Sequence, residues 1–238
     1  MWWQGIESAP DIVKYCINSI KNTAKNMDVI VLNQENYNEY IDVPKKIIKK
    51  VEKGEITKTF FSDYIRMKLL SEYGGYWMDS TIFMTKNIFE NIKNKDFYTL
   101  KLDSSDFNNK KMISKGKWCG FFIGGSKNNK LFLFASEFLT RYIIKEDFLI
   151  DYFLIDYVIN LAYKNIDEVR DMIDSIPHNN EKIFELSKIM NVGYDEKIFD
   201  NIKQVNDIHK LSYKEENYCY DKNGNITFYG KVLKCNER

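Results

Sequence analysis

The charged residues best placed for chemistry stand in a segment that is otherwise too apolar to tolerate them. Residues 60–81, FFSDYIRMKLLSEYGGYWMDST, begin with a run that predicts a helix apolar almost all round and therefore buried. Asp63 and Arg66 stand three positions apart in this helix and share one face. Burying the two ions costs several kcal/mol per ion unless they pair or meet a polar ligand. The spacing therefore predicts an ion pair that is either structural or part of a binding site.

A third charged residue, Asp79, follows a glycine break and a short aromatic run. Gly74 suits the left-handed residue that ends a helix, and Tyr-Trp-Met over residues 76–78 is typical of a short buried strand. A carboxylate at the C-terminal end of a strand in an α/β sheet points into the crevice where such folds bind ligands. On the alternative interpretation, Asp79 is an ordinary turn residue.

Taken together, S-D-x-x-R, Y-G-G-Y-W and D-S-T resemble the bacterial capsular polysaccharide synthesis family of glycosyltransferases. They are also similar to the wider group that holds the fungal α-1,6-mannosyltransferases and the clostridial glucosylating toxins, which share S-D-x-x-R followed by Y-G-G-x-Y/W-x-D-x-D. The resemblance implies an α/β fold with one GT-A-like domain over residues 1–238. It implies a mixed, mostly parallel sheet flanked by helices, with a helical and hairpin C-terminal elaboration. Residues 1–110 would form the nucleotide-binding half and residues 111–238 the acceptor half.

The resemblance also implies roles for the three charged residues. Asp63 would bind hydroxyls of the donor sugar, and Arg66 would bind the sugar or its diphosphate. Asp79 would hold the ribose or a metal ion. The donor is expected to be a nucleoside-diphosphate sugar, with a UDP-sugar foremost, and the acceptor a saccharide or lipid-linked saccharide.

At the N-terminus, Trp-Trp-Gln-Gly over residues 2–5 suggests the last part of a first strand with a turn after it. By resemblance, Trp3 would stack on the nucleotide base, and Gln4 and Gly5 would line the turn. The alternative is a pair of core tryptophans near a chain end, because Trp is commonly buried for its area alone.

Two later segments carry further candidates. Residues 147–163 predict a helix that resembles the family's Y-F-L-I-D-Y segment, with Asp147 and Asp151 on one face and Asp156 off to the side. Asp151 could orient an acceptor hydroxyl or act near the reacting carbon. The alternative is that these acids only stabilise a helix start.

Residues 208–214, IHKLSYK, resemble the family's C-terminal H-K-L-T-Y/W-K element, which returns over the donor site. His209 could complete a metal site, and Lys210 or Lys214 could pair with phosphate. An ordinary structural histidine is an equal alternative for His209, and a lone exposed histidine is the interpretation for His178.

Metal dependence is open, because the D-S-T triplet departs from D-x-D. Two carboxylates one residue apart can face one divalent cation that neutralises the leaving diphosphate, but Thr81 has no charge. Asp79 and His209 are the candidate ligands for Mn²⁺ or Mg²⁺. Alternatively, Asp79 accepts hydrogen bonds from the ribose.

Other elements follow from periodicity and turn residues. A helix capped by Ser8 is expected to run to about Asn26, and the β-branched run over residues 28–32 predicts a second strand. Residues 97–102 and 118–125 predict further strands. Gly124 and Gly125 suit either a close approach of ligand or backbone, or a plain turn. The dipeptide Asn223-Gly224 predicts a hairpin.

Bulk composition excludes several classes of protein. The 35 basic and 34 acidic residues give a net charge of +1, which provides no reason to expect nucleic acid. A mean hydropathy of −0.44 excludes a protein made of spanning helices, so membrane contact would be peripheral. The four cysteines form no C-x-x-C pair, and no signal peptide is evident at the N-terminus. We therefore expect a reduced, cytoplasmic chain, with the inner face of the membrane as a further location.

The leading hypothesis is a hexosyltransferase of surface polysaccharide synthesis that retains anomeric configuration, as the toxin and mannosyltransferase relatives do. A catalytically inactive sugar-nucleotide-binding or scaffold subunit is the alternative. It is supported by Thr81, which stands where D-x-D has its second acidic residue. A nucleotidyltransferase is a weaker option, since residues 2–10 hold no glycine- and basic-rich loop.

Overall fold

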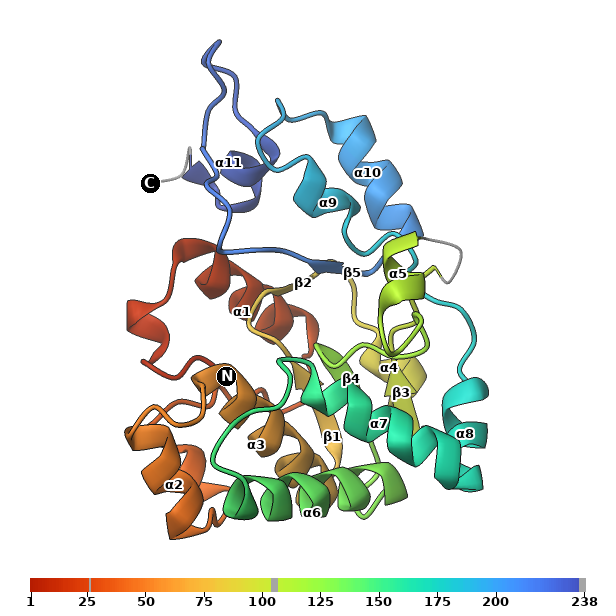
Figure 1. Ribbon diagram of the computed structural model, residues 1–238. Coiled ribbons are helices and arrows are strands. Elements are labelled where there is room, and N and C mark those ends of the chain that lie inside the picture. Colours follow the sequence, from red (N-terminus) through yellow and green to blue (C-terminus); the bar gives the residue numbers. More distant parts are fainter. Residues whose placement is uncertain (26, 104–106, 236–238) are drawn as a thin grey trace. The chain divides into compact units, whose positions relative to one another are not determined.

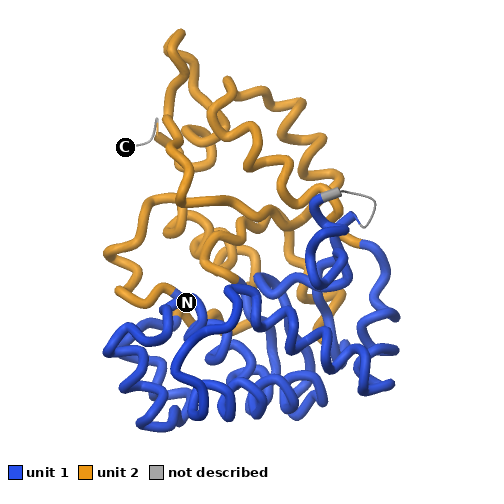
Figure 2. The backbone as a smooth tube through the Cα atoms, viewed as in Figure 1, with its two compact units in different colours: residues 1, 32–78, 94–178 blue, residues 2–31, 79–93, 179–238 orange. Residues whose placement is uncertain are grey.

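The computed structural model describes residues 1–25, 27–103 and 107–235 (Figure 1). Helices and short strands divide into two compact units, each assembled from segments far apart in the sequence (Figure 2). Unit 1 comprises Met1, Leu32–Met78 and Asn94–His178, and unit 2 comprises Trp2–Val31, Asp79–Lys93 and Asn179–Arg238. The boundary between two of these segments falls directly before Asp79.

Unit 1 packs helices around a three-stranded sheet of order β1-β4-β3. Its strands are β1 (Gly75–Met78), β3 (Phe97–Thr99) and β4 (Phe122–Gly125), and both pairs are antiparallel. Ile123 stands opposite Trp77 on one side and Thr99 on the other. Its helices are η2 (Tyr37–Glu39), α2 (Lys45–Glu52), α3 (Lys58–Tyr73), α5 (Phe107–Lys111), α6 (Lys130–Lys145), α7 (Leu154–Asn165) and α8 (Asp167–Asp174).

Helix α3 confirms the buried helix expected from its sequence. Thr57 caps its first turn, since its hydroxyl accepts a hydrogen bond from the Phe60 N–H at 3.1 Å. The helix packs against α6 and ends at Gly74, which has φ +72°. A Cβ at Gly74 would lie 2.6 Å from the Lys127 nitrogen, so both the conformation and the space require glycine.

The glycines of β4 serve the sheet. Gly124 and Gly125 lie inside the strand and not in a turn. A Cβ at Gly125 would lie 2.1 Å from the carbonyl oxygen of Asp96, and one at Gly124 would lie 2.3 Å from that of Gly75. Close approach of neighbouring backbone therefore accounts for both glycines.

Unit 2 is built on helix α1 (Asp11–Thr23) and a two-stranded antiparallel sheet of β2 (Ile82–Met84) and β5 (Ile208–Lys210). Helix α1 packs on β2, where the Ser19 hydroxyl accepts a hydrogen bond from the Met84 N–H at 2.9 Å. The hydrophobic core of unit 2 contains Val13 of α1 together with Leu186 and Phe228 from later segments. The remaining helices are η1 (Ile6–Ser8), α4 (Phe89–Ile92), α9 (Glu185–Lys188), α10 (Glu196–Val205) and α11 (Phe228–Val232).

Several expected elements differ from those observed. Residues 2–5 form a turn, in which the Gly5 N–H donates to the Trp2 carbonyl at 3.1 Å. Ser8 ends η1 instead of capping α1, which ends at Thr23, while Asn26 lies outside the described residues. Residues 28–32 form no strand, since strand propensity is realised only where neighbours cover the chain, and Ile30 is exposed.

The mixed α/β composition is confirmed. All pairs between the named strands of the described residues are antiparallel. The mostly parallel sheet of a GT-A fold therefore stays a prediction. Within the described part of the chain, no helix has both the length and the hydrophobicity of a bilayer span.

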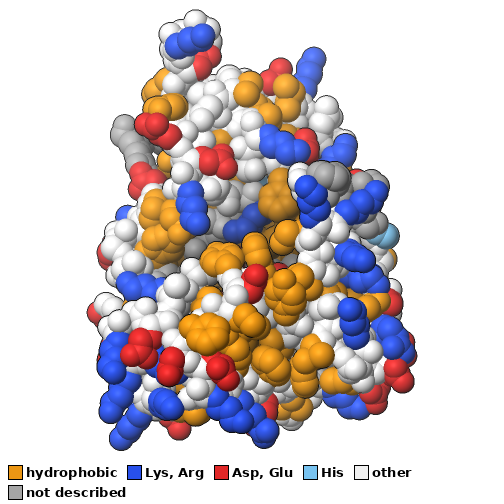
Figure 3. Space-filling model, viewed as in Figure 1, with side chains coloured by type: hydrophobic (Ala, Val, Ile, Leu, Met, Phe, Trp, Pro, Cys, Tyr) orange, Lys and Arg blue, Asp and Glu red, His pale blue; other side chains and the backbone are white. Residues whose placement is uncertain are grey.

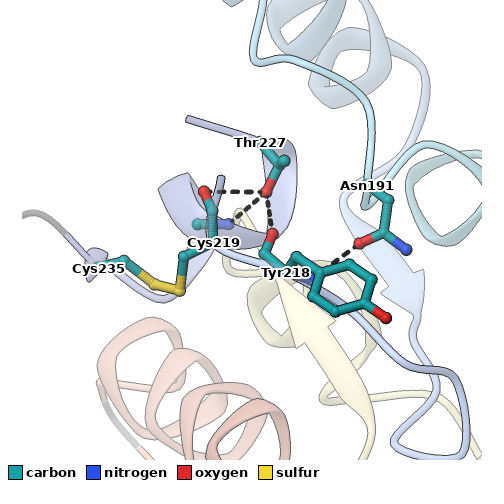
Figure 4. Close-up of a disulfide and its surroundings, with 6 residues drawn as sticks. Asn191, Tyr218, Cys219, Thr227 and Cys235 are labelled. Carbon is teal, nitrogen blue, oxygen red and sulfur yellow. Dashed lines mark hydrogen bonds between the residues drawn. A yellow bond between two sulfur atoms is a disulfide. The ribbon is translucent and has the colours of Figure 1, made fainter. Parts of the chain in front are cut away.

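A disulfide corrects the expectation of a fully reduced chain. Cys219 and Cys235 are bonded (Figure 4), while Cys16 and Cys119 are free and buried. The expected turn at Asn223 forms, with the Asp221 N–H donating to the Asn225 carbonyl at 2.8 Å. This turn and α11 return the chain so that two cysteines 16 positions apart meet. The sequence carried no signal for this pairing, because it depends on the path between them.

The thiol content of the purified protein tests this arrangement. Without reductant, we expect no fast-reacting thiol in the native state, since burial also raises the pKa of the Cys16 thiol to about 12. Denaturation should expose two thiols, and denaturation with reductant should expose all four. A chromogenic disulfide reagent counts them. Four thiols in the denatured, unreduced protein would contradict the disulfide.

Candidate functional site

In unit 1, the Asp63 and Arg66 side chains form the buried ion pair that their spacing predicts. Arg66 Nη2 lies 3.1 Å from Asp63 Oδ1, and the two side chains are 7% and 9% exposed. They are buried because α3 packs on nearly all sides, with Tyr64, Ile65 and Met67 fully inaccessible between and beside them. The pair thus occupies an environment in which ionic interactions are strong and an unpaired charge is costly.

The Arg66 guanidinium also lies over an aromatic ring. Its central carbon is 5.1 Å from the centroid of Trp77, a residue of β1. On another side, a Cβ at Gly120 would lie 2.8 Å from Arg66 Nη1. A cation over the face of Trp is attracted to the ring, and Gly120 leaves space for the guanidinium. Sheet and helix therefore both fix the position of the charge.

Asp156, which was predicted to lie off the face of Asp147 and Asp151, is within the electrostatic field of Arg66. It stands in the first turn of α7 and accepts a hydrogen bond from Trp118 Nε1 at 2.8 Å. Burial raises the pKa of Asp156, while the Trp118 hydrogen bond and the positive charge of Arg66 oppose this rise. Arg66 thus lies in the field of two carboxylates.

Asp156 was missed because the predicted helix began too early in the sequence. Helix α7 begins at Leu154, seven residues later than residue 147, so the faces assigned from an earlier start do not apply. The sequence did hold a usable signal for Asp156, the same one that identified Asp63: an acidic residue in a segment of buried aliphatic residues. In α7 these aliphatic residues include Ile155 and Val158, which are buried.

Asp151 is placed differently from Asp156. It precedes α7, and its Oδ1 accepts a hydrogen bond from the Phe153 N–H at 2.7 Å, which shapes the turn into the helix. Asp147 pairs with Lys50 of α2 at 3.0 Å. Its expected location on one helical face with Asp151 was wrong, because residues 146–153 are not helical. The described hydrogen bond of Asp151 is local, so its acceptor role stays a prediction.

In unit 2, Asp79, Thr81 and Lys210 meet at the start of the small sheet. Lys210 Nζ donates a hydrogen bond to Thr81 Oγ1 and lies 3.6 Å from Asp79 Oδ2. The register pairs Ile82 with Lys210, and the Leu211 N–H donates to the Thr81 carbonyl at 2.9 Å. Strand pairing thus brings the lysine of the C-terminal element to the D-S-T triplet. The Asp79 and Lys210 side chains remain 31% and 21% exposed, so both can meet solvent or a ligand.

His209 occupies a different environment from its neighbour Lys210. Successive side chains of a strand point to opposite faces, and the His209 ring is fully buried beside Phe83, at 6.1 Å between centroids. Within the described residues, neither ring nitrogen has a hydrogen-bond partner. Burial lowers the pKa of His209 to about 4, with Asp207 acting weakly in the opposite sense.

The two expected metal ligands, Asp79 and His209, therefore lie in different environments. Asp79 is paired with an ammonium group, the Thr81 hydroxyl is engaged by that same group, and His209 faces away from Lys210. No three His, Cys, Asp or Glu side chains gather into a potential metal site within residues 1–25, 27–103 and 107–235. The donor set described here does not by itself fit a tightly held divalent cation.

The N-terminal candidates separate into a core residue and a turn. Trp2 packs on the core of unit 2 and meets the Tyr213 ring edge-on, with 5.2 Å between centroids. Trp3 is half-buried, Gln4 is exposed, and Gly5 has φ +85° with no atom close to where a Cβ would be. A core role thus holds for Trp2, while the base-stacking role of Trp3 stays a prediction.

Comparison with known proteins gives one family. A family model described as capsular polysaccharide synthesis protein matches residues 1–232. Searches of curated proteins and of solved structures returned no match. The matched range includes every candidate residue described above in both units.

A double-mutant cycle tests the Asp63–Arg66 pair. Asp63→Asn leaves the buried guanidinium without its closest countercharge and should lower the free energy of unfolding by about 3–5 kcal/mol. Asp63→Asn with Arg66→Met should cost less than the two single changes added together. The exposed pair of Asp167 with Arg170 has the same spacing in unit 1, and Asp167→Asn should cost below about 1 kcal/mol. Urea unfolding measures all four variants. Additive single losses would argue against a buried pair.

The pH dependence of stability tests the burial of His209. Its pKa is about 4 in the folded chain against 6.5 ordinarily, so the unfolded chain takes up the proton first as pH falls. Stability from this group is complete above pH 6.5 and declines towards pH 4, by about 2 kcal/mol at pH 5. His209→Leu should reduce the loss between pH 7.5 and 5 by that amount in urea unfolding. A His209→Leu variant that loses as much stability as wild type over this range would contradict the burial of a neutral imidazole.

Proposed function

Because the chain belongs to the capsular polysaccharide synthesis protein family, we propose that it is a glycosyltransferase of that pathway. The donor is a nucleoside-diphosphate sugar, with a UDP-sugar foremost, and the acceptor is a saccharide or a lipid-linked saccharide. The observation that carries the proposal is the buried Asp63–Arg66 pair, together with Asp156, whose pKa is raised by burial and lowered in part by the charge of Arg66. An assembly of ionised groups in an apolar core is costly to stability, and such groups are typical of functional sites.

The first part of the proposed chemistry uses the groups of unit 1. Asp63 accepts hydrogen bonds from donor-sugar hydroxyls, and Arg66 donates to the sugar or to the diphosphate. The Trp77 ring lies against the guanidinium before any substrate binds, and the carboxyl group of Asp156 lies within its field. Pre-oriented charges stabilise the positive anomeric centre and the leaving diphosphate without reorganising during the reaction. By similarity to the retaining relatives, we propose retention of anomeric configuration.

The second part uses the groups of unit 2. Lys210 pairs with the diphosphate, and Thr81 orients its ammonium group through their hydrogen bond. Asp79 accepts hydrogen bonds from the ribose, while Trp3 stacks on the base beside Gln4 and Gly5. A Mn²⁺ or Mg²⁺ ion, when bound, would neutralise the same diphosphate. Because Thr81 stands where D-x-D has its second carboxylate, we propose that Lys210 supplies positive charge there, and the role of metal becomes a variable of the test.

An inactive sugar-nucleotide-binding subunit is the second candidate. It is favoured by Thr81, which stands in the second acidic position of D-x-D and is buried. This candidate shares donor binding with the first and differs in turnover.

A donor screen separates these functions. We expect one nucleotide sugar, among UDP-, GDP- and dTDP-linked hexoses, to raise the thermal midpoint of the purified protein. Ligand at 100 times its Kd stabilises by about 2.7 kcal/mol. Arg66→Lys should weaken this stabilisation, because a lysine does not reproduce the planar donor fork. Asp171→Asn, an exposed change on α8, should not. Stabilisation by none of the donors would contradict the proposal.

Turnover is measured next, with EDTA and with Mn²⁺. Release of the nucleoside diphosphate from the stabilising donor is the expected result, and Asp79→Asn should lower the rate at least about tenfold, since it removes a charge that orients the donor. Release that continues in EDTA supports Lys210 as the source of charge. Donor binding without release under either condition supports the inactive subunit.

A further inference from the structure

A set of large apolar side chains is exposed on one surface of unit 1. It is formed by the loop before α7 and by the outer side of α7, and Figure 3 shows hydrophobic side chains gathered over this region. Phe148 and Ile150 are 64% and 68% exposed. The apolar surface consists of Phe148, Ile150, Tyr152, Phe153, Tyr157 and Leu161. Contiguous exposed apolar side chains mark interaction sites in soluble proteins.

The loop is held in the conformation that displays these side chains. The Tyr142 hydroxyl donates to the Phe148 carbonyl and accepts from the Ile150 N–H, both at 2.9 Å. Lys50, which is buried, pairs with Asp147 at 3.0 Å and ties the loop to α2. Exposed apolar residues in a loop with such anchoring are a property of the folded state and not of a frayed segment.

Beside the loop lies an apolar hollow with one cation at its edge. It has a volume of about 320 Å³ and is lined by Phe138, Leu154, Tyr157 and Leu161, with Lys164 among the lining residues. An apolar hollow with a lysine beside it suits a hydrocarbon chain that ends in an anionic head group.

The charges around the surface have the sign that an anionic lipid surface requires. Lys145, at the end of α6, and Lys164, at the end of α7, are exposed. Lys46 of α2 is exposed and close enough to lower the pKa of Asp147. Of the loop acids, Asp147 is paired with Lys50 and Asp151 binds the Phe153 N–H. Glu146 is exposed, so four lysines, with Lys50 included, stand against the three loop acids Glu146, Asp147 and Asp151, which leaves a small positive excess.

We propose that this surface binds the head-group region of an anionic lipid bilayer. Aromatic and aliphatic side chains would enter the interface, and the lysines would lie at head-group level, as in other interfacial surfaces. The tyrosines suit this position because each ring is apolar and each hydroxyl can remain hydrated. The inference does not depend on the identity of the donor or on turnover.

Sedimentation with vesicles tests the proposal. Wild type should bind phosphatidylcholine vesicles that contain phosphatidylglycerol more tightly than pure phosphatidylcholine, and added salt should weaken the difference. Phe148→Ser with Ile150→Ser should bind at least about tenfold more weakly. The matched control is Val192→Ser with Ile198→Ser, which removes two exposed aliphatic residues of unit 2 and should bind as wild type does.

A charge-matched pair of variants separates attraction at this surface from net charge. Lys46→Glu, Lys145→Glu and Lys164→Glu together should lower binding to anionic vesicles about tenfold or more. The same changes at the exposed Lys21, Lys25 and Lys197 alter net charge equally and should have a smaller effect. Unchanged thermal midpoints establish that the variants fold.

Three results would overturn the proposal. One is wild-type protein that stays in the supernatant with both kinds of vesicle. Another is equally tight binding by the Phe148 and Ile150 variant. The third is a homodimer in sedimentation velocity that this variant dissolves, since a second copy would then cover the surface.

Discussion

The buried Asp63–Arg66 ion pair is the constraint on which the structure of unit 1 depends. Helix α3 is apolar on nearly all sides, so the two charges are largely removed from bulk water, with only 7% and 9% of their side chains exposed. The Trp77 ring of β1 lies against the guanidinium, and Asp156 of α7 is near enough for the charge of Arg66 to oppose the rise in its pKa that burial causes. The guanidinium of Arg66 thus contacts residues of both α3 and the sheet.

Unit 2 shows how strand register selects which side chains can act. Pairing of β2 with β5 brings Lys210 to Thr81 and Asp79, whereas the preceding His209 is buried beside Phe83. A shift of one residue would exchange the two environments, because strand side chains alternate between faces. The charge presented beside the D-S-T triplet is therefore that of an ammonium group, which is suited to phosphate and does not require a metal ion to be positive.

The exposed aromatic loop has the opposite energetic character. There the fold uses a buried lysine and the Tyr142 hydroxyl to hold Phe148 and Ile150 in contact with water. Leaving such side chains exposed forgoes the stabilisation that burial would give. Buried charge and exposed apolar surface thus occur in the same unit, and each departs from the usual distribution in a manner that a ligand or a surface could compensate.

The sequence by itself determined the features that depend on near neighbours. Asp63 pairs with Arg66 because residues three apart on a helix meet, and the family was recognisable chiefly from the motifs within residues 60–81. Only the tertiary structure decided that Asp156 accepts a hydrogen bond from Trp118 within the field of Arg66, and that Cys219 bonds to Cys235. Those contacts depend on where a helix begins and on how the chain returns, and side chains far apart in sequence meet only when packing fixes both.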